Sequence, residues 1–150
     1  MKRNIILLAF LLITALISAQ NHSKSLSSVE SKHDFEQTYA RLVQKLEELQ
    51  LPVFADFNHY ENAQGVGLAM GKSRVVVFGN PKVGTLLMQE NPAIALDLPM
   101  KIAVIEDKNQ KIQLIFTNTS ELAKKYRIKN KSIAEKMQFL LQNIVDFAAN

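Results

Sequence analysis

Apolar residues recur at helical spacing in two long stretches of the chain. Between positions 35 and 49, and again between 133 and 147, they return every three or four residues. This spacing predicts two amphipathic helices, each with one face against a core. Asp34, followed three residues later by Gln37, predicts the start of the first helix as a capping box, and Ser132 with Glu135 predicts the start of the last one.

Other stretches have the spacing or the continuous apolar character of β-strands. Strands are expected at 29–32, 53–57, 75–78, 100–105 and 112–116, and the apolar run 66–70 is expected to lead into a further strand. The polar residues 107–110 predict a turn between the last two strands. Pro81 suits the first position of a helix reaching Glu90, and Asn91-Pro92 ends it. Further helical segments are expected at 93–96 and 119–126.

The order of these elements predicts the fold class. It runs strand, helix, several strands with an inserted helix, a hairpin, and terminal helices. We therefore predict an α+β fold, with a mainly antiparallel sheet and helices packed on one face. The predicted organisation is a single domain at 29–150, preceded by a polar, flexible lead-in at 20–28.

The first 19 residues have the pattern of a secretory signal peptide. Lys2 and Arg3 form a basic start, an apolar run covers 5–17, and Ser18-Ala19 suits cleavage before Gln20. The alternative is a retained membrane anchor, but the apolar run is shorter than the roughly 18 residues that a spanning helix needs. We expect an exported protein, periplasmic or secreted, with no membrane span after cleavage.

Charge and cysteine content exclude several classes of function. The formal net charge of the chain is +4, and cleavage of the leader removes Lys2 and Arg3, which leaves +2. So small a charge gives no case for nucleic-acid or membrane binding. The basic residues of the segment 124–131 are expected to form a solvated helix end. The chain has no cysteine, so disulfides and thiol catalysis are excluded.

Residues 75–90 form the most informative stretch of the chain. They read V-V-V-F-G-N-P-K-V-G-T-L-L-M-Q-E, and residues 96–99 read L-D-L-P. These segments resemble the Domain of Unknown Function 302 family, with the departure that Leu86 stands where the family often has proline. The resemblance implies a fold similar to the TATA-box-binding-protein class, in a β-α-β(4)-α arrangement, and a homodimer. The family implies no reaction, and the fold analogy implies no DNA binding.

The turn after the strand at 75–78 is the first candidate site. Backbone amides at a helix start attract anions, and Lys82 and the Thr85 hydroxyl offer further donors. The segment lacks the spacing of a P-loop. Asn80 also has a structural role open to it, because its side chain can bond the turn backbone, and this role is the one the residues favour. The ligand-site alternative comprises Gly79, Asn80, Pro81, Lys82, Gly84, Thr85 and Met88, together with His59.

His59 is the single residue best suited to acid–base chemistry. It follows a predicted strand, in a polar segment. A histidine there can act as a general base, a metal ligand or a pH sensor. No second histidine lies at ligand spacing and no nucleophile motif accompanies it, so a structural or solvent-exposed role is favoured.

A metal site is not predicted. Met70, Met88 and Met100 can bind soft metals such as copper, but core packing explains methionine at these positions better. Asp97 is expected to cap a turn or to orient a basic group, and Glu106-Asp107 to belong to the hairpin turn. The sequence names no cofactor.

Three hypotheses for function follow. The first is a non-enzymatic exported domain that binds a small ligand or a protein partner near residues 79–88 and His59. The second is an enzyme that uses His59 as acid or base, with Asn80 or Thr85 positioning the substrate; it requires these groups to share one pocket. The third gives the family-like segment 75–90 a purely structural role: it forms a dimer interface, with Leu86, Leu87 and Met88 buried between subunits.

Overall fold

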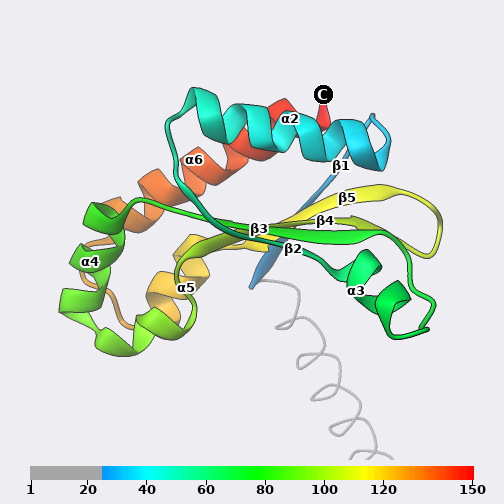
Figure 1. Cartoon of the computed structure of the whole chain (residues 1–150). Coiled ribbons are helices and arrows are strands. Elements are labelled where there is room, and N and C mark those ends of the chain that lie inside the picture. The colour runs from blue at the N-terminus through cyan, green and yellow to red at the C-terminus, as the bar shows by residue number, and fades with distance from the viewer. Residues whose placement is uncertain (1–24) are drawn as a thin grey trace, which may run out of the picture.

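The computed structural model describes residues 25–150, which form one antiparallel sheet with helices around it (Figure 1). The five strands lie in the order β1-β5-β4-β3-β2 and every neighbouring pair is antiparallel. Their bounds are β1 Leu26–Glu30, β2 Val53–Asn58, β3 Ser73–Phe78, β4 Met100–Glu106 and β5 Ile112–Thr117. The proposed leader 1–19, and 20–24 of the lead-in, lie outside the described residues.

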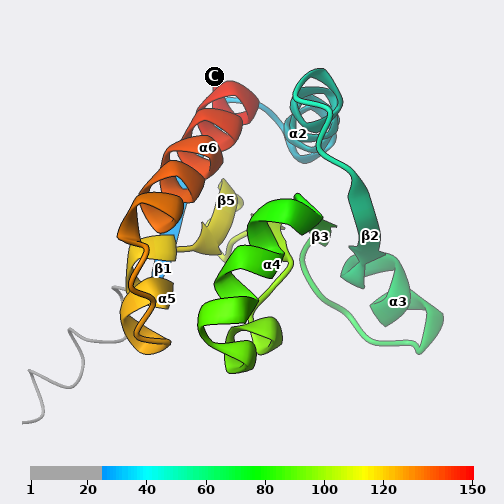
Figure 2. The ribbon, with the colours of Figure 1, turned by 90° about the vertical axis from the view of Figure 1, so that its left-hand side faces the viewer.

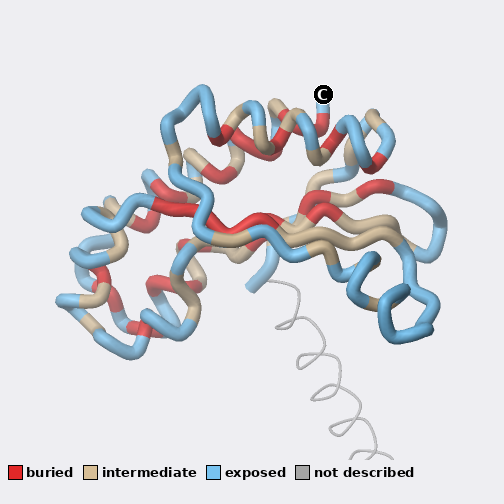
Figure 3. The backbone as a smooth tube through the Cα atoms, in the orientation of Figure 1, coloured by how far each residue is buried: buried red, intermediate tan, exposed pale blue. Residues whose placement is uncertain are grey.

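Two long helices cover one face of the sheet. They are α2, Phe35–Glu48, and α6, Lys131–Ala149, and they lie side by side above the strands in Figure 1. Their apolar stripes pack on alternate residues of β3, β4 and β5, such as Val76, Ile102 and Leu114, all fully buried. Because side chains alternate across a strand, Val75, Ala103 and Ile115 face the other way. That face carries no helix over its middle, and Figure 3 shows intermediate exposure there.

The shorter helices lie at the two ends of the strands. Helix α3, His59–Gly65, follows β2 at one end, while α4, Pro81–Glu90, follows β3 at the other. The 3₁₀ helix η1, Pro92–Leu96, and α5, Thr119–Lys125, complete the α4 end. Figure 2 shows α4 and α5 near the start of α6 at this end. Together with η1, they share a second apolar cluster, which includes Leu87, Ile94, Leu122 and Met137.

The structure confirms the α+β prediction and corrects three local ones. The specific likeness to the TATA-box-binding-protein class stays a prediction. The first strand begins at Leu26, inside the predicted lead-in, because it pairs with β5 from Leu26↔Thr117 onward. Residues 66–72 form a turn and loop, not a strand. The last helix begins at Lys131, and the Ser132 hydroxyl donates to Asn130 instead of capping.

Candidate functional site

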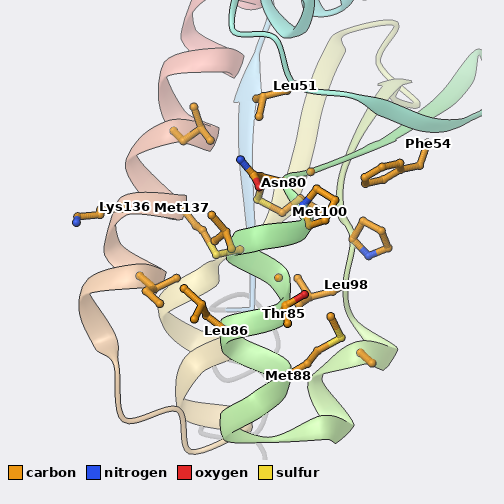
Figure 4. Close-up of a pocket in the computed structure, with 18 residues that line it drawn as sticks. Leu51, Phe54, Asn80, Thr85, Leu86, Met88, Leu98, Met100, Lys136 and Met137 are labelled. Atoms are coloured by element: carbon orange, nitrogen blue, oxygen red, sulfur yellow. The ribbon is translucent and has the colours of Figure 1, made fainter.

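A cavity of about 530 Å³ lies around the first turns of α4 (Figure 4). We call it the α4 pocket. Its walls come from four parts of the chain: the turn and helix at 79–88, the segment 95–100 from η1 into β4, Leu51 and Phe54 near the start of β2, and one face of α6 at 133–140. Side chains on both flanks of α4 line it. This size falls within the range of small-molecule sites, which is roughly 300–1,000 Å³.

The strand–turn–helix segment sets the position of α4 against this cavity. Strand β3 ends at Phe78, and the buried Gly79 then donates its N–H to the Pro52 carbonyl at 3.3 Å. The Asn80 Oδ1 accepts the Lys82 N–H at 2.9 Å, and Pro81 takes the first helical position. Leu87 is the one buried residue of α4, and it anchors the helix to the second cluster, with Val83 and Met88 packed partly buried beside it. The first two turns are left free to border the cavity.

Carbon and sulfur make up nearly all of the pocket wall. Three of the lining residues, Met88, Met100 and Met137, carry thioethers, which are adaptable and tolerate ligands of different shape. Polar atoms on lining side chains come from Asn80, Thr85 and Lys136 alone. Phe54, 49% exposed, stands at the rim.

The structure brings six of the eight candidate residues to this pocket. They are Gly79, Asn80, Pro81, Gly84, Thr85 and Met88. Lys82 is exposed on the outer side of the turn and does not line the cavity. His59 does not line it either. The structure therefore joins the strand–turn–helix candidates and leaves the histidine apart from them.

His59 and the turn at 79–85 lie at opposite ends of the same two strands. Asn58 pairs with Arg74 at the start of β3, whereas Val53 pairs with Phe78 at its end. A six-residue strand spans roughly 17–20 Å. His59 opens α3 and stacks on Phe57, with ring centroids 6.3 Å apart. The single pocket required by the enzyme hypothesis is therefore not formed.

The structure also argues against the hypothesis that Leu86, Leu87 and Met88 form a dimer interface. Leu87 is 2% exposed and packs inside its own chain, in the cluster with Leu122 and Met137. Leu86 is half exposed, and the exposure of Met88 is intermediate between those of Leu86 and Leu87. The three residues therefore do not form one surface, since consecutive helical side chains point in different directions.

The packing interpretation of the methionines holds for Met88 and Met100, which pack against the apolar clusters, and is wrong for Met70, which is exposed. Met88 and Met100 line the α4 pocket, while Met70 is exposed in the loop before β3. No group of three or more histidine, aspartate or glutamate residues within 25–150 is placed to hold a metal ion. The methionines considered as soft ligands are thus not gathered around His59.

Asp97, from the L-D-L-P segment, orients a basic group as expected. Its Oδ2 accepts from the Lys125 Nζ and from the Tyr126 hydroxyl, both at 2.7 Å. The ammonium of Lys125, followed by the hydroxyl of Tyr126, lowers the pKa of the Asp97 carboxyl below its ordinary value. The cluster ties η1 to α5, so the role of Asp97 in this structure is to hold one wall of the pocket region.

A second polar cluster lies toward the other end of the sheet. The Tyr39 hydroxyl donates to Asp56 at 2.5 Å, Arg74 pairs with the same carboxylate at 2.7 Å, and the guanidinium stacks on the Tyr39 ring at 3.9 Å. Burial, and then the hydrogen bond to Asp56, raises the pKa of Tyr39 to about 12. These three side chains satisfy one another and join α2 to β2 and β3.

Sequence reasoning missed the pocket residues that come from distant segments. Leu51, Phe54, Leu98, Ile133, Lys136 and Met137 all line the cavity. Leu98 was noted only as part of L-D-L-P, and Met137 only as part of a helical stripe. No local pattern distinguishes an apolar side chain that borders a cavity from one that fills a core.

Comparison with known proteins identifies the family. The family described as "Domain of unknown function DUF302" matches residues 27–144. The chain belongs to the DUF302 family. The crystal structure of an uncharacterized conserved DUF302 protein from Bacillus stearothermophilus is similar, with a TM-score of 0.73 and 20% identity, over 83% of this chain and 98% of that one. The resemblance seen in the sequence is therefore confirmed, and the fold with it.

Curated relatives of the DUF302 domain are longer proteins. Those named Fluoride-specific ion channel FluC 1, from Brucella suis and Brucella abortus, are 33% identical over 103 residues, or 69% of this chain. The match covers 41% and 38% of their lengths, so this chain corresponds to less than half of either protein. Among residues 25–150, no helix has the length and apolar character needed to cross a bilayer.

Proposed function

We propose that this DUF302 domain is a non-enzymatic binding module that holds a small ligand in the α4 pocket. The observation that carries the proposal is the cavity of about 530 Å³ beside the family's strand–turn–helix segment. Concave, largely apolar pockets with a few polar groups are the usual form of small-molecule sites. Six residues chosen from the sequence alone border this one, although none was chosen for its position on a cavity.

The pocket provides binding but little for catalysis. Its lining residues include no histidine, aspartate or glutamate. A general acid or base must lie within hydrogen-bonding reach of the substrate, and His59 lies at the far end of the strands. The enzyme alternative therefore has no support from the geometry of the described residues.

The test is retention of a ligand by the purified protein, with one variant that fills the cavity. A Cβ at Gly84 would lie 3.9 Å from the Met88 methyl and 4.0 Å from Leu98, so a leucine there extends into the pocket. Gly65, in α3, is the matched control, because a Cβ there meets nothing within 4 Å. We expect native mass spectrometry of the exported protein to show a bound mass that Gly84→Leu loses and Gly65→Leu retains.

Two results would contradict this function. If the protein retains no mass and no small hydrophobic probe binds it, the cavity does not serve as a ligand site. If Gly84→Leu, still folded by circular dichroism, retains the ligand as well as Gly65→Leu does, the ligand is bound elsewhere. A bound protein partner would instead favour the interaction alternative.

We further propose export and dimerisation. The basic, apolar and small-residue segments of 1–19 support export to the periplasm or beyond. The sheet face that α2 and α6 leave uncovered supports a homodimer, because apolar residues such as Val75, Ala103 and Ile115 are only half buried there. A second copy can pair this face with itself about a two-fold axis.

A further inference from the structure

The few polar atoms of the α4 pocket restrict the chemistry of its occupant. Asn80, Thr85 and Lys136 are the lining residues whose side chains carry nitrogen or oxygen. The Asn80 Oδ1 is already engaged, since it caps α4 through the Lys82 N–H. Its amide nitrogen has no hydrogen-bond partner in the described chain and can only donate. A ligand atom that meets this nitrogen must therefore be an acceptor.

Thr85 offers a second polar contact on the other flank of α4. Figure 4 shows Asn80 on the flank toward α6 and Thr85 on the flank toward Leu98. The Thr85 hydroxyl forms no hydrogen bond within residues 25–150, and it can both donate and accept. An uncharged oxygen therefore finds a partner on either side of the helix.

Charged groups find no counter-ion inside the pocket. Lys136 is exposed, and in Figure 4 its amine lies on the outer side of α6, away from α4. Of the neighbouring acids, Asp97 already holds Lys125 and Tyr126, and Glu90 accepts backbone N–H groups just before α6. A charged ligand group placed among the apolar side chains of the wall would lose its hydration without compensation, which is strongly unfavourable.

We infer that the α4 pocket takes an uncharged hydrophobic molecule, long enough to contact both flanks of α4, with a hydroxyl, ester or carbonyl oxygen as its acceptor. The inference rests on the proposed function and specifies the ligand class of the same site. Three methionines give the walls the adaptability to follow an alkyl or ring system of variable shape.

The methionine methyl groups provide a test by NMR. Met88, Met100 and Met137 line the pocket, whereas Met70 lies in the loop before β3 and acts as an internal reference. The protein, labelled with ¹³C at methionine methyls, is titrated with four ten-carbon probes: decanol, methyl decanoate, decanoate and decylamine. We expect the two neutral probes to shift the three pocket signals and leave Met70 unchanged. The two charged probes should bind about tenfold more weakly or worse.

Control variants distinguish this inference from the proposed binding function on which it rests. Gly84→Leu should abolish the pocket shifts, and Gly65→Leu should preserve them. Lys136→Met should not weaken the binding of decanoate. If decanoate or decylamine binds in the pocket as tightly as decanol, the neutral-ligand inference is wrong and the binding function stands. If no probe shifts the three pocket methyls selectively, both are wrong.

Discussion

Asparagine has one repeated role at the residue scale: it begins helices. The Oδ1 atoms of Asn58, Asn80, Asn91 and Asn118 each accept a backbone N–H in the first turn of α3, α4, η1 and α5. Such caps satisfy amides that have no partner within the helix. Asn80 thus makes the turn contact that the sequence predicts. Because a cap uses only the carboxamide oxygen, the nitrogen remains for a ligand.

Substitutions at Asn80 can separate these two roles. Asn80→Ala removes the cap and should lower the free energy of unfolding by about 1 kcal/mol. Asn80→Asp keeps a capping oxygen, so its stability should stay near wild type. It also replaces the donor with a charge, so decanol should bind more weakly. Urea denaturation and the methionine NMR titration measure the two effects, and unchanged decanol binding by a folded Asn80→Asp would contradict a contact there.

Tyr39 gives a pH dependence at the residue scale. Its pKa is raised from 10.0 to about 12 by burial and by its hydrogen bond to Asp56. The contribution of neutral Tyr39 to stability is therefore complete below pH 10 and is lost as the pH rises toward 12. Ultraviolet titration should show Tyr39 ionising late together with Tyr126, whose pKa is raised by its hydrogen bond to Asp97, and Tyr39→Phe should remove one of these two late tyrosines. If Tyr39→Phe leaves the number of late-titrating tyrosines unchanged, the hydrogen bond of Tyr39 does not persist in solution.

At the element scale, the end of α4 supports the start of α6. Asn130 precedes α6 but makes no side-chain cap. The Glu90 carboxylate instead accepts the N–H of Lys129 at 2.7 Å and that of Asn130 at 3.3 Å. A negative charge beside a helix N-terminus is also favourable to the helix dipole. Ser132 was the wrong choice because the helix begins before it, at Lys131, with Asn130 in the N-cap position.

Removal of the Glu90 charge should reveal this support. Glu90→Gln should lower the free energy of unfolding by about 1 kcal/mol, since a charge-assisted contact becomes neutral. Glu135→Gln, an exposed change in the first turns of α6, is the matched control and should have little effect. Equal stabilities of the two variants in urea would show that Glu90 does not hold the helix start.

Leu86 and Leu87 allow a second test at the element scale. Leu87 anchors α4 in the second cluster, so Leu87→Ala should cost about 2–5 kcal/mol through its cavity. Leu86 is half exposed, and Leu86→Ala should cost far less. The interface hypothesis predicts the opposite pattern: monomers from either change, with intact stability. Sedimentation and thermal melting of both variants separate the two cases.

The whole molecule contains two apolar clusters and one uncovered sheet face. The larger cluster lies between the sheet and α2 and α6, and the smaller one lies among α4, η1, α5 and α6. The α4 pocket adjoins both, since Leu140 packs on the first and Met88 on the second. Filling of this pocket by a ligand should therefore stabilise the packing of both clusters.

The proposed dimer is tested at this scale. Ile115→Lys places a charge in the middle of the uncovered face, while Ile115→Thr keeps a β-branched, uncharged side chain there. We expect sedimentation to report a dimer for wild type and for the threonine variant, and a folded monomer for the lysine variant. A wild-type monomer, or a dimeric lysine variant, would contradict an interface on this face.

The sequence by itself determined the elements and the family. Helical spacing at 35–49 and β-branched runs such as 75–78 are local properties, so they predicted the strands, most helices and the α+β class. The signature at 75–90 located the turn for the same reason. Only the tertiary structure decided which candidates act together. Strand pairing placed His59 at the far end of β3, and helix packing brought Met137 and Leu98 to the turn, through contacts between segments distant in the chain.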